Sequence, residues 1–263
     1  MGYIRLLLSL LVMAAHLAGF RPDLASWCVW LFYLLSGFLA ELAMTTKYTG
    51  RSFFVGRLYR IFPVFWVSAL LTLFTFNVWG NPDVFPLISY PLQREWVLLN
   101  IQHWWGGFFG PRLMPHAWAL TVMLFWWAVM ALGGYRGRRL WFWTGAGIAA
   151  TIAGAYPMSI QWFSLWGGML PFAVGAWLYR NGLELPADNG LAMMGGAFSY
   201  PLYCCHYAVA IPVAHLLGLG IGWPLFFAAL APTLALSWLL VVAVERPVQK
   251  FRSSLKKTMP PTP

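Results

Sequence analysis

The chain has 263 residues, of which 60% are hydrophobic and only 9% are charged, and its formal net charge is +10. Because a soluble domain carries about 25% charged residues, this composition excludes an ordinary water-soluble protein and predicts a helical membrane protein. The apolar runs are continuous and about twenty residues long, without the strand alternation of an outer-membrane barrel. The cations lie between these runs, as the positive-inside rule expects, so the net charge does not indicate nucleic-acid binding.

The first apolar run, residues 4–20, contains an arginine and a histidine. Arg5 and His16 are eleven positions apart. Eleven steps of about 100° return to within about 20° of the starting direction, so both side chains share one helical face, about 16 Å apart. Two interpretations are open: a snorkelling arginine with a hydrogen-bonded histidine, or a functional pair.

Eight apolar stretches bounded by charges or by Gly and Pro are predicted to be transmembrane helices. They cover about 3–20, 24–45, 61–79, 116–134, 140–156, 161–179, 191–217 and 223–244. If the N-terminus is cytoplasmic, the segments on that side hold 14 of the 17 Lys and Arg residues. The positive-inside rule therefore predicts an all-α, polytopic transmembrane helix bundle of about eight spans, with cytoplasmic N- and C-termini. This bundle covers residues 1–245, and the basic cytoplasmic tail, 246–263, is expected to be disordered.

Two further features of the sequence are its aromatic segment and its cysteines. The segment at about 80–115 is rich in aromatic residues and glycine, and it is either a re-entrant loop over the bundle mouth or an interfacial aromatic belt. The three cysteines, Cys28, Cys204 and Cys205, have neither disulfide nor zinc spacing. They are predicted to be packing residues, and no metal site is predicted.

Three arginines, Arg51, Arg57 and Arg60, precede the third predicted span. Arg57 and Arg60 are three positions apart, so a helix would place them on one face just before Pro63. The stretch has no carboxylate, and guanidinium groups bind phosphate bidentately, so these arginines favour an anion site. The alternative is an ordinary positive-inside loop.

Few other polar groups lie within the apolar segments. They are Ser36 in the second span, His116 and Trp118 at the start of the fourth, and Ser199, Tyr200, Tyr203 and His206 in the seventh. The spacing of Ser199, Tyr203 and His206 places them on one helical face. Taken singly, such a residue more often makes a helix–helix hydrogen bond than it performs chemistry.

In this order, the segments resemble the acyltransferase-3 family of integral membrane O-acyltransferases over most of the chain. The resemblance is carried by seven motifs: Arg5 with His16, Phe32–Phe38, Phe53–Pro63, Trp118–Leu120, Leu170–Gly175, Ser199–His206 and Val244–Pro247. It implies transfer of an acyl group, usually acetyl from acetyl-CoA, to a hydroxyl of a glycan, a lipid-linked saccharide or another acceptor. It implies a multi-pass protein of the bacterial inner membrane, with acyl-CoA as co-substrate and no permanently bound cofactor.

The resemblance also implies roles for individual residues. His16 is the expected catalytic residue, as general base or as a covalent acyl relay, and Arg5 is expected to function with it. Acyl-CoA is expected to bind at Arg57 and Arg60, with Arg51 beside them. Residues expected near the acceptor or the oxyanion are Ser36, His116, Trp118, Tyr200, Tyr203 and His206. For His206, a structural role is the better-supported interpretation.

Two departures from the family pattern support other functions. Met123 stands where many members have a glutamate, and neither Glu41 nor Glu245 is an expected substitute, because both are predicted near the cytoplasmic side. The chain is also short for the family. The alternatives are a transporter or flippase without chemistry of its own, and a catalytically silent relative. The acceptor, the acyl chain length and the oligomeric state cannot be deduced from the sequence.

Overall fold

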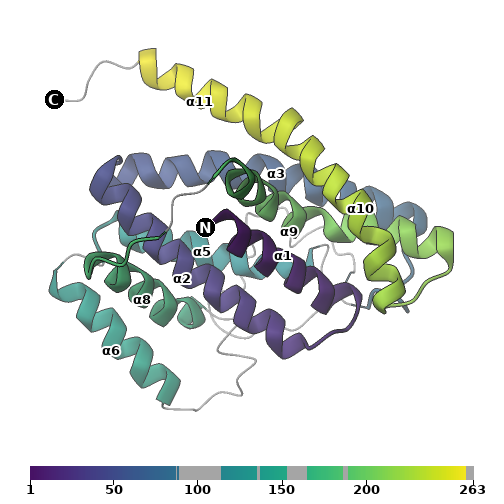
Figure 1. Ribbon diagram of the computed structural model, residues 1–263, viewed down its shortest axis with the longest axis horizontal. Coiled ribbons are helices and arrows are strands. Elements are labelled where there is room, and N and C mark those ends of the chain that lie inside the picture. The colour runs from purple at the N-terminus through teal and green to yellow at the C-terminus, as the bar shows by residue number, and fades with distance from the viewer. Residues whose placement is uncertain (87, 89–113, 135–136, 153–164, 186–188, 259–263) are drawn as a thin grey trace. The chain divides into compact units, whose positions relative to one another are not determined.

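The computed structural model describes residues 1–86, 88, 114–134, 137–152, 165–185 and 189–258. Within these ranges all regular structure is helical, which confirms the all-α prediction. The helices are α1 (Gly2–Leu17), α2 (Pro22–Thr46), α3 (Gly50–Trp79), η2 (Pro115–Ala117), α5 (Trp118–Ala131), α6 (Arg138–Ile152), η3 (Leu165–Gly168), α8 (Met169–Arg180), α9 (Gly190–Leu217), α10 (Trp223–Leu240), η4 (Val241–Glu245) and α11 (Arg246–Thr258) (Figure 1). Most of the predicted 80–115 loop lies outside the described residues.

Three of the described helical segments are long and apolar enough to cross a membrane, namely Asp23–Thr46, Gly50–Trp79 and Trp223–Ser254. Two further apolar helices, Gly2–Leu17 and Pro115–Ala131, are shorter. These three helices support the prediction from composition that the chain is a membrane protein. The prediction of about eight spans goes beyond this finding and stays a prediction.

Helices α3 and α10 have polar residues inside and apolar residues outside. In α3, Ser68 and Thr72 are fully buried, and in α10, Thr233 and Ser237 are fully buried. The outward residues of α3 are Trp66, Leu70, Phe74 and Val78, all 50–59% exposed. Their four-residue spacing forms one stripe along the helix. Such a stripe is unfavourable in water but matches hydrocarbon, so this pattern indicates a lipid-facing surface.

The chain divides into two compact units. The first contains Met1–Phe20, Val55–Asn81 and Asp188–Pro263, and the second contains Arg21–Phe54 and Pro82–Ala187.

In the first unit, α1 packs along α9, and α9 packs along α10 (Figure 1). Two of the hydrogen bonds between α1 and α9, Ser9 with Ser199 and His16 with His206, link residues 190 positions apart. A constant offset means that α1 and α9 run in the same direction. The start of α9 is fixed by Asn189, whose side chain accepts a hydrogen bond from the Ala192 backbone N–H at 2.8 Å, a standard N-cap.

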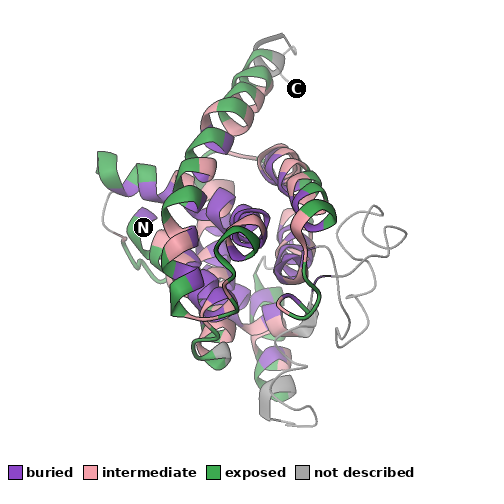
Figure 2. Cartoon of the chain, turned by 90° about the vertical axis from the view of Figure 1, so that its right-hand side faces the viewer, coloured by how far each residue is buried: buried purple, intermediate pink, exposed green. Residues whose placement is uncertain are grey.

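Two boundaries differ from the sequence prediction. Helix α3 begins at Gly50 rather than near residue 61, so the three arginines lie on a helix and not in a loop. The tail that was expected to be disordered from residue 246 is helical over Arg246–Thr258, and only 259–263 lie outside the described residues. No residue of 246–254 is buried, and Figure 2 shows this helix mostly green and pink towards the C-terminus.

In the second unit, α2 and α8 approach each other closely at two glycines. A side chain at Gly37 would overlap the backbone of Phe172, and one at Gly175 would overlap the backbone of Leu34. Small residues commonly allow such contacts between membrane helices.

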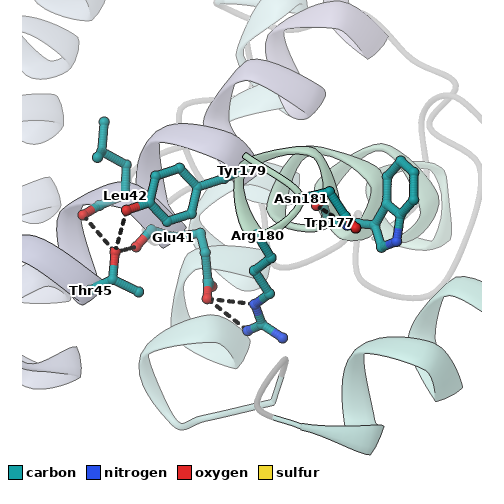
Figure 3. A network of polar contacts seen from close by, with 7 residues as sticks. All are labelled: Glu41, Leu42, Thr45, Trp177, Tyr179, Arg180 and Asn181. Atoms are coloured by element: carbon teal, nitrogen blue, oxygen red, sulfur yellow. Dashed lines mark hydrogen bonds and ion pairs between the residues drawn. The ribbon is translucent and has the colours of Figure 1, made fainter. Parts of the chain in front are cut away.

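One end of this α2–α8 seam carries an ion pair (Figure 3). The Arg180 guanidinium donates to Glu41 Oε1 at 2.8 Å, and Thr45 Oγ1 donates to Tyr179 Oη at 3.0 Å. An unpaired charge within an apolar segment would be costly, and the ion pair with Arg180 neutralises the Glu41 carboxylate.

Candidate functional site

The centre of the candidate site is a pair of histidines in the first unit. His16 Nδ1 lies 3.1 Å from His206 Nε2, and the two imidazole rings are stacked with centroids 5.3 Å apart. His206 Nδ1 lies 2.9 Å from the backbone oxygen of Tyr203, one helical turn earlier. His206 is fully buried, whereas His16 keeps intermediate exposure. His16 is therefore the more exposed of the two imidazoles.

Tyr207 holds both imidazoles in place. Its ring stacks on His16 with centroids 5.5 Å apart and lies 4.6 Å from the His206 centroid. Tyr203 and Tyr207 are themselves buried on α9. An imidazole packed against an aromatic ring and a second imidazole loses most of its freedom to rotate, which favours one defined orientation.

Arg5 lies towards the other end of α1 and also faces α9. Its guanidinium occupies the space beside Gly196, where a Cβ atom would collide with it. Between Arg5 and His16, Ser9 Oγ donates to the backbone oxygen of Ser199 at 2.8 Å. The prediction that Arg5 and His16 share one helical face is confirmed, since both contact α9. Eleven residues of helix separate them by about 16 Å.

Arg60 lies in an ion pair that the sequence analysis missed. Its Nε is 3.4 Å from Glu245 Oε1, and Arg5 also interacts electrostatically with Glu245. The arginine set expected to lack a carboxylate therefore has one, contributed by a residue 185 positions away. An anion that binds at Arg60 therefore either shares the guanidinium with the Glu245 carboxylate or displaces that carboxylate.

Glu245 is positioned by a π-helical turn. The helix that starts at Trp223 changes to π geometry over Val241–Glu245 and returns to α geometry at Arg246. Such turns are rare and occur often at functional sites. The second carboxylate oxygen, Oε2, is buried and has no hydrogen-bond partner among the described residues.

The remaining predicted residues are distributed between the units. The Tyr200 hydroxyl donates a hydrogen bond to the backbone oxygen of Ile61 at 2.8 Å, which gives this side chain a structural role. Arg57 lies on α3, three residues before Arg60. The residues assigned to the second unit are Ser36, Arg51, His116 and Trp118; of these Arg51 is exposed and the other three are buried.

Sequence reasoning named His206 but did not pair it with His16, and it set Glu245 and Glu41 aside. A usable signal was present for the two carboxylates. An acidic residue inside an apolar segment requires a cation nearby, and Arg60 and Arg180 are among the few candidates. The pairing of His16 with His206 depends on the α1–α9 register, which no local pattern encodes.

No protein-family model matches the chain, and comparison with curated proteins and with solved structures likewise gives no match.

Proposed function

We propose that the protein is a membrane O-acyltransferase, most simply an O-acetyltransferase, that moves an acyl group from acyl-CoA to a hydroxyl acceptor. The observation that carries the proposal is the His16–His206 hydrogen bond at 3.1 Å, which joins a partly exposed imidazole to a buried one. A catalytic base is commonly oriented by a hydrogen bond to a further group, as by the carboxylate of a Ser–His–Asp triad, and His206 is in the place to do this for His16.

The basic end of the cluster supports the donor half of the proposal. Arg5, Arg57 and Arg60 are contributed by α1 and α3, and guanidinium groups are suited to the phosphates of coenzyme A. The distance of about 16 Å between Arg5 and His16 is one that an extended pantetheine arm can bridge. In this proposal, the arginines bind the phosphates of acyl-CoA, and the thioester lies beside His16.

Two routes use these residues. In the first, His16 Nε2 removes the proton of the acceptor hydroxyl, the oxygen attacks the thioester carbonyl, the C–S bond breaks, and the proton passes to the leaving thiolate. In the second, His16 Nε2 attacks the thioester carbonyl, the C–S bond breaks and coenzyme A leaves as thiolate; the acceptor oxygen then takes the acyl group from Nε2, and the hydroxyl proton neutralises the thiolate. Both routes give an ester and free coenzyme A.

The proposal includes a topology. Eight spans with cytoplasmic N- and C-termini would put Arg5, Arg57 and Arg60 at the cytoplasmic edge, where acyl-CoA is available. His16 would then lie towards the opposite face, where a glycan or lipid-linked acceptor of a bacterial inner membrane would be reached. The parallel direction of α1 and α9 is consistent with this arrangement, since first and seventh spans cross in the same sense.

The test is acetyl transfer in inverted membrane vesicles supplied with radiolabelled acetyl-CoA, with alkali-labile label in the membrane glycan and lipid fraction as readout. His16→Ala is expected to abolish transfer, and His215→Ala, an exposed histidine of the same helix as His206, is the matched control. Both variants are first checked for equal membrane insertion. Full transfer by His16→Ala would reject the catalytic assignment.

A transporter or flippase is the second candidate, and Met123 is the observation that favours it, since a family glutamate is missing there. This candidate predicts that wild-type vesicles form no new ester bond from labelled acetyl-CoA. Movement of a preformed acylated lipid between leaflets, unaffected by removing acetyl-CoA, would support it over the enzyme.

A further inference from the structure

The hydrogen bonds around the two histidines determine which nitrogen of each ring carries a proton. A backbone carbonyl can only accept, so the 2.9 Å contact between His206 Nδ1 and the Tyr203 oxygen requires a proton on His206 Nδ1. His206 is fully buried, where a neutral imidazole is much less costly than a cation. A neutral ring protonated at Nδ1 has a bare Nε2, which is therefore an acceptor.

The bond to His206 in turn determines which nitrogen of His16 carries a proton. Because His206 Nε2 accepts, the 3.1 Å contact requires His16 Nδ1 to be the donor. His16 in its neutral form then carries its lone pair on Nε2, the nitrogen remote from His206. A general base needs its lone pair on the atom that meets the substrate, so the chain of bonds from Tyr203 through His206 prepares His16 for proton abstraction at Nε2.

We propose that His206 is a positioning residue that fixes His16 in the tautomer with a protonated Nδ1 and a basic Nε2. This inference rests on the proposed acyltransferase function for its kinetic consequences, but the tautomer itself does not. When His16 takes a proton at Nε2, its Nδ1–H still donates to His206 Nε2, so the hydrogen bond also stabilises the cation formed during the reaction. His206 thus fills, with a neutral ring, the orienting position that a carboxylate holds in a Ser–His–Asp triad.

The helices explain how this arrangement is held. His206 lies in the middle of α9, its Tyr203 partner is one turn away on the same helix, and Tyr207 packs against both imidazoles. The register between α1 and α9 is held by the Ser9–Ser199 bond, seven residues before the histidines on each helix. The orientation of His16 is therefore determined by the helix packing.

The direct test is nitrogen-15 solid-state NMR of the full-length protein, with labelled histidine, in lipid bilayers. The His16 signals are identified by their absence in His16→Ala. The expected spectrum shows His16 protonated at Nδ1 and bare at Nε2, with a hydrogen-bond coupling from Nδ1–H to His206 Nε2. A His16 ring protonated at Nε2 and bare at Nδ1 would overturn the proposal.

The kinetic test compares two substitutions of His206. His206→Leu removes the acceptor, and kcat for acetyl transfer is expected to fall by about 100-fold while KM for acetyl-CoA stays unchanged. His206→Gln offers an amide oxygen to the His16 Nδ1–H and is expected to retain most of the activity. Wild-type kcat in His206→Leu would overturn the proposal. If wild-type protein transfers no acetyl group, the proposed function fails, and the spectrum still decides the tautomer.

Discussion

The Ser9 hydroxyl donates a hydrogen bond to the backbone oxygen of Ser199 at 2.8 Å, across the buried seam between α1 and α9. The same O–H is shared with the Arg5 backbone oxygen of its own helix, which lies 3.0 Å from Ser9 Oγ. The bond lies between Arg5 and His16 along α1, and it shares the 190-residue offset of the His16–His206 bond. One hydroxyl therefore helps to set the register at both ends of the candidate site.

Ser9→Ala is expected to lower the free energy of unfolding by about 1 kcal/mol, the usual contribution of a polar contact between membrane helices. Unfolding in mixed detergent and denaturant, followed by tryptophan fluorescence, measures this change. Ser254→Ala, which removes an exposed hydroxyl bonded only within α11, should leave stability unchanged. Equal effects of the two substitutions would contradict the role given to the α1–α9 bond.

The Arg5 position can be tested without changing Arg5. A Cβ at Gly196 would occupy the place of the guanidinium, whereas the nearest atoms to a Cβ at Gly195 are 3.4 Å away. We expect Gly196→Ala to displace Arg5 and raise KM for acetyl-CoA about tenfold, equivalent to about 1.4 kcal/mol of binding. Gly195→Ala is the control on the adjacent residue and should behave as wild type. If both alanine variants bind the donor normally, Arg5 does not contribute to donor affinity.

The sequence was sufficient for the helices but not for their pairing. Apolar runs of about twenty residues predict helices, and the 3.6-residue period correctly places Arg5 and His16 on one face. Their partners are distant in sequence: Gly196 and His206 on α9 become neighbours only through packing of two whole helices. Neither hydrophobic period nor residue type carries the register of such a contact.

The boundary errors have a local physical cause. Gly50 and the arginines that follow it lie outside the predicted third span because charged residues leave the hydrocarbon core, yet leaving the core does not end a helix. Helix α3 continues through Pro63, and α11 continues after Glu245, in sequences of moderate helix propensity with long basic side chains. Hydropathy indicates where a helix enters the membrane and says little about where it begins.

Glu245 is expected to compete with bound phosphate for Arg60. The two side chains are 3.4 Å apart, with Glu245 12% and Arg60 33% exposed. Glu245→Gln removes the negative charge but keeps the shape, so acetyl-CoA should bind several-fold more tightly, and binding should weaken more steeply as salt is added. Isothermal titration with coenzyme A in detergent measures both effects. Unchanged or weaker binding would mean that Glu245 supports the site and does not compete for it.

The Glu41–Arg180 pair belongs to the second unit and has a structural role in this account. Arg180 Nη2 lies 2.7 Å from Glu41 Oε1, and the carboxylate side chain is only 9% exposed. Arg180→Ala leaves that carboxylate without its cation and should destabilise the protein by about 2 kcal/mol, less than the 3–5 typical of a fully buried pair. Because the cost comes mainly from the unpaired buried carboxylate, the double variant Arg180→Ala with Glu41→Leu should recover part of the lost stability.

The exposed pair of Arg21 and Asp23 provides the comparison, since Asp23→Asn should leave the unfolding midpoint unchanged. A double variant that is less stable than Arg180→Ala alone would show that Glu41 contributes through other contacts.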